Sequence, residues 1–86
     1  MAKEYTKVNK LGDKSYYKDP EMTILHRRDG PAVEYYDGVK SWVVNGKSHR
    51  LDGPAIEWVG GNKEWLVNGV FIFELSSEGK LEARMK

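Results

Sequence analysis

The only two histidines of the chain open two copies of one polar segment. The first copy reads His26-Arg27-x-Asp29-Gly30-Pro31-Ala32, and the second reads His49-Arg50-x-Asp52-Gly53-Pro54-Ala55. An arginine guanidinium presents a fork of donors that fits a carboxylate or another planar anion in bidentate fashion. Two such clusters side by side would form a polar patch that holds an anion or an acidic segment of a partner protein.

The same residue types also have a structural interpretation. Asp-Gly-Pro is a turn signal, because Asp accepts bonds from nearby backbone amides, Gly adopts angles that other residues avoid, and Pro begins the next strand. In this interpretation His and Arg end one strand, and Asp closes the turn or pairs with an Arg. Repetition in register favours it, since a residue that every repeat needs is usually needed to build the repeat.

The sequence offers little for catalysis or metal binding. Two histidines at an offset of 23 match no established ligand spacing. The chain has no cysteine, and its serines lie in no nucleophile-elbow context. Glu34 and Glu57 recur in the two copies, but a catalytic carboxylate pair needs distinct environments within a cleft. The sequence therefore predicts no enzyme, no metal site and no cofactor.

The polar segments belong to a longer repeat. Residues 26–46 and 49–69 align without a gap, and 13 of the 21 aligned residues are identical. A fainter copy precedes them, because residues 12–16 (GDKSY) parallel residues 38–42 (GVKSW). We therefore divide one domain, residues 1–86, into a degenerate half-repeat at 12–25, repeat one at 26–48, repeat two at 49–71 and a C-terminal cap at 72–86.

Turn dipeptides divide each repeat into strands. Asp37-Gly38, Asn45-Gly46, Gly60-Gly61 and Asn68-Gly69 are typical of two-residue type I′ hairpin loops. They predict a single antiparallel β-meander with strands near 32–36, 39–44, 47–50, 55–59, 62–67 and 70–74. An early strand is expected near 4–8. For the tail we favour a helix over 77–85 capped by Ser76, and a hairpin turning at Glu78-Gly79 is the alternative.

A two-residue turn at Asp37-Gly38 would place Tyr36 opposite Val39 and Val33 opposite Trp42. Because side chains alternate along a strand, this register predicts which residues share a face. Lys40 and Lys63 would cross the core face beside aromatic rings, and the opposite face would be solvated. The predicted core face consists of Val33, Tyr35, Trp42, Val44, Ile56, Trp58, Trp65 and Val67.

Composition narrows the classes of partner. The chain has 86 residues, ten aromatic residues and a formal net charge of +1, which is far from the footprint of a DNA-coating protein. Without cysteine, so small a core must be stabilised by aromatic packing or by oligomerisation. No apolar run is long enough to span a membrane, and the first residues lack the apolar stretch of a signal peptide. We therefore expect a soluble, cytoplasmic protein.

The tandem segment, followed by Glu, an aromatic residue, a Gly turn, Lys-x-Trp and Asn-Gly, resembles the MORN-like β-hairpin repeats of small bacteriophage and bacterial proteins. The resemblance covers residues 26–69 well and residues 12–25 poorly. It implies a non-catalytic binding or structural module that is phage-encoded. The chain lacks the Gly-x-Gly spacing of standard MORN repeats, so their lipid binding does not carry over.

These observations predict a protein-binding β-repeat module, a phage product that modulates or inhibits a host protein in the bacterial cytoplasm. The alternative is RNA or single-stranded DNA binding through Lys and aromatic side chains. A homodimer that buries the Trp42/Trp65 face is a further expectation. The candidate binding residues are His26, Arg27, Asp29, His49, Arg50, Asp52, Tyr36, Lys40, Trp42, Lys63 and Trp65.

Overall fold

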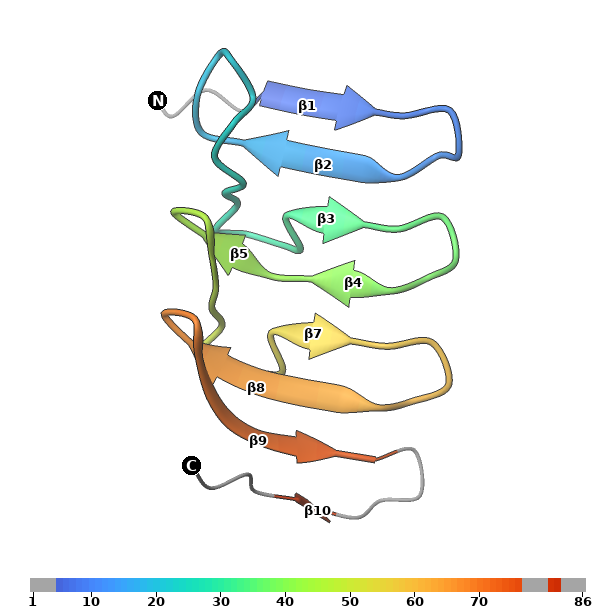
Figure 1. Cartoon of the computed structure of the whole chain (residues 1–86), viewed down its shortest axis with the longest axis vertical. Coiled ribbons are helices and arrows are strands. Elements are labelled where there is room, and N and C mark those ends of the chain that lie inside the picture. Colours follow the sequence, from blue (N-terminus) through green and yellow to red (C-terminus); the bar gives the residue numbers. More distant parts are fainter. Residues whose placement is uncertain (1–4, 77–80, 83–86) are drawn as a thin grey trace.

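The computed structural model describes residues 5–76 and 81–82, and these form antiparallel strands without a helix (Figure 1). Eight strands make one sheet in the order β1-β2-β3-β4-β7-β8-β9-β10, and β5 pairs with β6 apart from it. The predicted β-meander is confirmed. The strands are β1 (Tyr5–Val8), β2 (Lys14–Tyr17), β3 (Val33–Glu34), β4 (Lys40–Ser41), β5 (Val43–Val44), β6 (Lys47–Ser48), β7 (Ile56–Glu57), β8 (Lys63–Val67), β9 (Val70–Leu75) and β10 (Leu81–Glu82).

The preferred C-terminal helix is wrong where the structure describes it. Leu81 and Glu82 form β10 and pair antiparallel with Leu75 and Glu74 of β9. The remainder of the predicted helix lies outside the described residues. A strand added at this edge satisfies backbone groups of β9 that a separate helix would leave unpaired, and this outweighs local helix propensity.

The two Asn-Gly turns are confirmed as two-residue loops. Val44 pairs with Lys47 around the first turn, and Val67 pairs with Val70 around the second. Both residues of each loop have positive φ, at 51° and 77° for the first and 51° and 79° for the second. This is the geometry that Asn-Gly favours, because it matches the twist of the strands. These tight turns line one side of the molecule (Figure 1).

The turns on the other side contain one residue more than predicted. Around Asp37-Gly38, the Tyr35 N–H donates to the Val39 carbonyl (2.9 Å) and the Gly38 N–H donates to the Tyr35 carbonyl (2.9 Å). The loop is therefore residues 36–38. Residues 10–12 and 59–61 form loops with the same two backbone bonds, and each loop ends on a glycine of positive φ. This pattern is the three-residue hairpin with a glycine bulge.

The extra loop residue shifts the register by one position. Val33 lies opposite Ser41 rather than Trp42, and Glu34 lies opposite Lys40. Since side chains alternate along a strand, a one-residue shift exchanges the faces of one strand relative to the other. The predicted core face is therefore wrong. Its members divide into Val33, Tyr35, Ile56 and Trp58 on one face, and Trp42, Val44, Trp65 and Val67 on the other.

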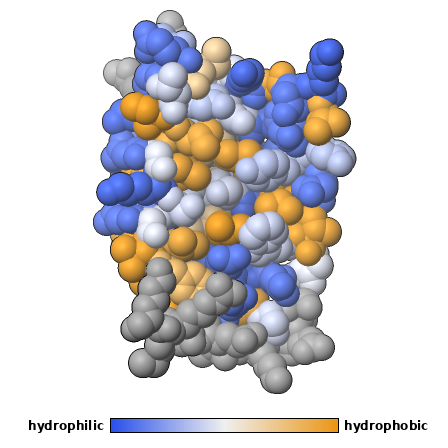
Figure 2. Space-filling view, viewed as in Figure 1, coloured by the Kyte–Doolittle hydropathy of each residue, from blue (hydrophilic) through white to orange (hydrophobic). Residues whose placement is uncertain are grey.

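We call the first of these the open face, defined by Val33, Tyr35, Val39, Ser41, Ile56 and Trp58. The second is the stacked face, defined by Tyr16, Lys40, Trp42, Lys63 and Trp65. In the view of Figure 2, apolar side chains gather across the middle of the molecule.

The buried interior is small. Ala32 and Ala55 are fully buried, and each links three strands through its backbone. The Ala55 N–H donates to Glu64 and its carbonyl accepts from Trp42, at 2.7 Å each. The other buried apolar residues of the described part are Tyr16, Val33 and Val43. The accessible surface of 6086 Å² exceeds the roughly 5,200 Å² that a compact protein of this mass exposes. The fold is thus a thin sheet with much surface for its size.

Candidate functional site

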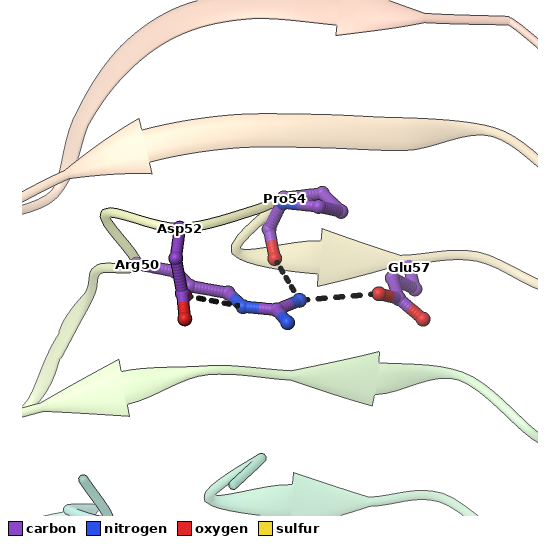
Figure 3. A network of polar contacts seen from close by, with 4 residues as sticks. All are labelled: Arg50, Asp52, Pro54 and Glu57. Atoms are coloured by element: carbon purple, nitrogen blue, oxygen red, sulfur yellow. Dashed lines mark hydrogen bonds and ion pairs between the residues drawn. The ribbon is translucent and has the colours of Figure 1, made fainter. Parts of the chain in front are cut away.

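The two repeated arginines occupy matching polar networks. Arg50 Nη1 donates to the Pro54 carbonyl (3.1 Å) and to Glu57 Oε2 (3.2 Å), while its Nε pairs with Asp52 Oδ1 at 3.2 Å (Figure 3). One repeat earlier, Arg27 makes the same three contacts at 3.1 to 3.3 Å. The partners there are Pro31, Glu34 and Asp29.

Each guanidinium is also packed between a ring and a glycine. The Arg50 Cζ lies 3.9 Å from the centroid of the Trp42 ring, and the Arg27 Cζ lies 3.9 Å from that of Tyr16. On the Gly53 side, a Cβ would lie only 2.8 Å from the Arg50 Cζ. A larger residue at this position would therefore push the guanidinium from its place on Trp42. Such a stacked, paired arginine contributes packing as well as charge to the fold.

The two histidines hold the next tight turn. The Asn45 N–H donates to His26 Nδ1 (3.0 Å), and the Asn68 N–H donates to His49 Nδ1 (2.9 Å). Each bond requires an unprotonated Nδ1, so the neutral ring carries its proton on Nε2. Burial lowers the pKa of His26 below its ordinary value, and the charges of Arg28 and Lys18 lower it further.

One repeat after Arg50, the corresponding residue is a phenylalanine instead of an arginine. An offset of 23 from Arg50 leads to Phe73, which stacks on Trp65 with ring centroids 4.5 Å apart. Phenylalanine thus takes the place that arginine takes in the two earlier positions. The stacked rings of Trp42 and Trp65 are both covered by a side chain of this protein.

Charges alternate along one row of the stacked face. Strand pairing places Lys40 between Glu34 and Glu57, and places Lys63 beside Glu57. Opposite charges on neighbouring strands stabilise a sheet modestly. The two lysines therefore lie beside carboxylates instead of forming a separate basic strip.

A groove of about 530 Å³ runs between the two polar segments. Its walls come from the turn segments of both repeats, from Trp42 between β4 and β5, and from Val44 of β5. Six of the predicted binding residues meet here, and His26, Tyr36, Lys40, Lys63 and Trp65 lie outside the groove. The lining residues are Arg27, Arg28, Asp29, Gly30, Trp42, Val44, His49, Arg50, Leu51 and Asp52.

Sequence reasoning missed Arg28 and Leu51. They occupy the one position of the seven-residue segment that differs between the two copies. Leu51 is 79% exposed, and Arg28 is exposed and forms none of the ion pairs found among the described residues. The signal that could have found them is their variation inside an otherwise identical segment.

A second, smaller groove of about 260 Å³ lies on the open face. It is lined by Tyr35, Asp37, Val39, Ser41, Ile56 and Trp58. Tyr35 and Trp58 remain 43% and 44% exposed, although both are large aromatic residues. Tyr36 projects from the neighbouring turn and is 66% exposed.

Comparison of the chain with known protein families, curated proteins and solved structures gives no match. The resemblance to MORN-like repeats therefore stays a prediction. Within residues 5–76 and 81–82, no group of three or more His, Cys, Asp or Glu side chains gathers closely enough to hold a metal ion. The same part of the chain contains no helix that could cross a membrane.

Proposed function

We propose that this chain is a non-catalytic protein-binding β-repeat module, and that its binding site is the groove between the two polar segments. The observation that carries the proposal is the placement of Arg28 and Leu51. The identical residues of the two segments are engaged in holding the repeats, whereas these two differ and face solvent at the groove. In repeat proteins the variable, exposed positions of one face commonly form the binding surface.

The chemistry of the groove favours an acidic and apolar segment of a partner protein. Arg27 and Arg50 each contact two carboxylates, an aspartate and a glutamate. The two glutamates also lie beside Lys40 and Lys63 on neighbouring strands. Arg28 adds a cation, and its guanidinium can take a carboxylate in bidentate fashion. Leu51, Val44 and Trp42 supply apolar walls beside it. An extended peptide with a carboxylate next to an aliphatic side chain would match both features.

Selection from a random peptide display library against the full chain tests this proposal. We expect the enriched peptides to carry Asp or Glu beside an aliphatic residue. Their affinity should fall about tenfold or more in the double variant Arg28→Ala/Leu51→Ala, since both anchors of the peptide are then removed. Trp58→Ala, on the open face, is the matched control and should bind the peptides normally. Enriched peptides that bind the double variant as tightly as the wild type would contradict the proposal.

Nucleic-acid binding has less support from the geometry. A base would have to displace Arg50 from Trp42 or Phe73 from Trp65 in order to stack on either ring. Titration with labelled single-stranded RNA tests this alternative. Tight binding with a steep salt dependence, lost in Lys40→Ala/Lys63→Ala, would favour nucleic acid over peptide. The phage origin, the host target and the cytoplasmic location stay predictions.

A further inference from the structure

The open face carries a row of residues that is basic at one end and acidic at the other. Strand pairing places one residue of each strand from β1 to β9 of the large sheet in this row. The first is a lysine, the last two are glutamates, and the middle is small or apolar. In order across the sheet the row is Lys7, Ser15, Val33, Ser41, Ile56, Glu64 and Glu74.

A parallel row, nearer the three-residue turns, holds the exposed aromatics. Tyr35 pairs with Val39 through their backbones, and Trp58 lines the same groove on the far side of Val39. The Trp58 ring is held in place because its Nε1 donates to Glu64 Oε2 (2.6 Å). One aromatic side chain thus lies on each side of β4.

Both rows are self-complementary about β4. Three strands, β1, β2 and β3, lie on one side of it, and β7, β8 and β9 lie at the matching places on the other. The edge strand β10, in which Glu82 pairs with Glu74, lies beyond them and has no counterpart next to β1. A rotation by half a turn about an axis parallel to the strands reverses the order of the strands and keeps the rows aligned. Under that rotation a basic end meets an acidic end, and each exposed aromatic residue meets the other.

We propose that a second copy of this chain covers the open face, in a dimer whose two-fold axis lies between the two faces, parallel to the strands and over β4. Lys7 then lies against the partner's Glu74, and Tyr35 lies against the partner's Trp58. Val33 packs on the partner's Ile56, and Val39 packs on the partner's Val39. Closed two-fold symmetry of this kind is the commonest arrangement of soluble homo-oligomers.

Charge selects this orientation over the other face-to-face dimer. An axis perpendicular to the strands would place Lys7 against the partner's Lys7, and Glu74 against the partner's Glu74. Like charges in such an interface disfavour the arrangement, whereas the proposed axis brings opposite charges together twice.

The face is also large enough for a stable dimer. The molecule measures 39 × 26 × 22 Å, so its broad face spans on the order of 1,000 Å², whereas a standard interface takes roughly 800 Å² from each partner. The two exposed aromatic residues on either side of β4 are of the residue type that dominates such interfaces. The dimer lies on the opposite side from the groove of the proposed function, so neither proposal depends on the other.

Sedimentation of the full chain at micromolar concentration tests the dimer. The wild type should sediment with the mass of two chains. The double variant Tyr35→Ala/Trp58→Ala should dissociate at least about tenfold more readily, because it loses the aromatic contacts on both sides of β4. Leu51→Ala, on the stacked side, is the control and should remain a dimer. A monomeric wild type would overturn the proposal, and so would a dimer that persists in a double variant with an unchanged circular dichroism spectrum.

A charge exchange tests the orientation independently. Lys7→Glu and Glu74→Lys each place two pairs of like charges in the proposed dimer, so each variant alone should dimerise about tenfold more weakly. An equimolar mixture of the two variants should form a heterodimer as readily as the wild type, because both pairs are then opposite in charge. High salt should reduce the difference. If the mixture dimerised no more strongly than each variant does alone, this orientation would be wrong.

Discussion

Single residues of the repeated segment are engaged in several contacts within the fold. Arg50 combines a ring stack, a backbone carbonyl and two carboxylates, and its side chain is only 23% exposed. The sequence showed that this residue type recurs, but the ring that covers it and the glutamate that pairs with it come from other strands. Spacing alone therefore left the structural and the binding interpretation open.

Arg50→Lys is expected to lower the free energy of unfolding by about 1–2 kcal/mol. Lysine keeps the charge but loses the planar stack on Trp42 and the fork that reaches Pro54 and Glu57 together. Urea unfolding followed by tryptophan fluorescence measures the change. Arg28→Lys, at an exposed position, is the control and should change stability by less than about 0.5 kcal/mol. Equal effects of the two substitutions would contradict a structural role for Arg50.

Acid is expected to weaken the fold through His26. Its pKa in the folded protein is lowered below the ordinary value of 6.5, mainly by burial, so the unfolded chain binds the proton more tightly. The contribution of His26 is therefore complete above pH 6.5 and is lost as the pH falls through the lowered pKa. Unfolding free energies measured at pH 7.5 and at successively lower pH values should decline below 6.5.

In the variant His26→Gln, the free energy of unfolding should decline less as the pH falls below 6.5. Asp13 and Asp19 also have lowered pKa values, through hydrogen bonds from Tyr36 and Thr23 respectively, but they lose their contribution only below about pH 4. The effect of His26 and the effect of the two aspartates therefore fall in different pH ranges and can be measured separately. A free energy of unfolding that increases as the pH falls from 6.5 to 5 would show that His26 is not held in its neutral form.

At the scale of elements, the turns determine which residues share a face. The sequence predicted the existence of the hairpins and both Asn-Gly turns. It could not distinguish a two-residue loop at Asp37-Gly38 from a three-residue loop that ends at the same glycine, because both require positive φ there. The extra residue in each three-residue loop shifts the register by one position, so Tyr35 and Trp58 lie on the face opposite Trp42 and Trp65.

The tight turns themselves should be sensitive to side-chain type. Asn68 has a φ of 51°, which most residues adopt only at a cost of about 1–2 kcal/mol. Asn68→Ala should therefore destabilise the protein by roughly 1 kcal/mol, whereas Asn68→Gly should change stability little. Thermal unfolding of both variants provides the comparison. If alanine and glycine behaved alike at this position, the turn geometry would not be the reason for asparagine.

The C-terminal tail also differs from what its local sequence predicts. Its residues have high helix propensity, yet Leu81 and Glu82 join β9 because an open sheet edge offers partners for their backbone. Propensity is a weak guide wherever a neighbouring strand is available. The same openness of the sheet leaves two broad faces for the whole molecule to cover or to use.

At the scale of the whole molecule, the two faces differ in what covers them. Side chains of the protein itself cover the rings of the stacked face, which also carries the groove with Arg28 and Leu51, and we propose that a second copy covers the open face. Net charge and composition had suggested a protein partner and self-association, and the predicted strand register had placed the dimer on the Trp42/Trp65 face. In the structure these rings are already covered, by Arg50 and Phe73.

Calorimetric titration of a library-selected acidic peptide into the full chain, combined with sedimentation of the saturated complex, tests both proposed surfaces together. We expect one peptide per chain and a complex of two chains with two peptides, because the groove and the proposed dimer contact lie on opposite faces. One peptide per two chains, or dissociation of the dimer on saturation, would contradict the division of the two faces. A peptide that binds Arg28→Ala/Leu51→Ala with unchanged affinity would contradict the assignment of the groove.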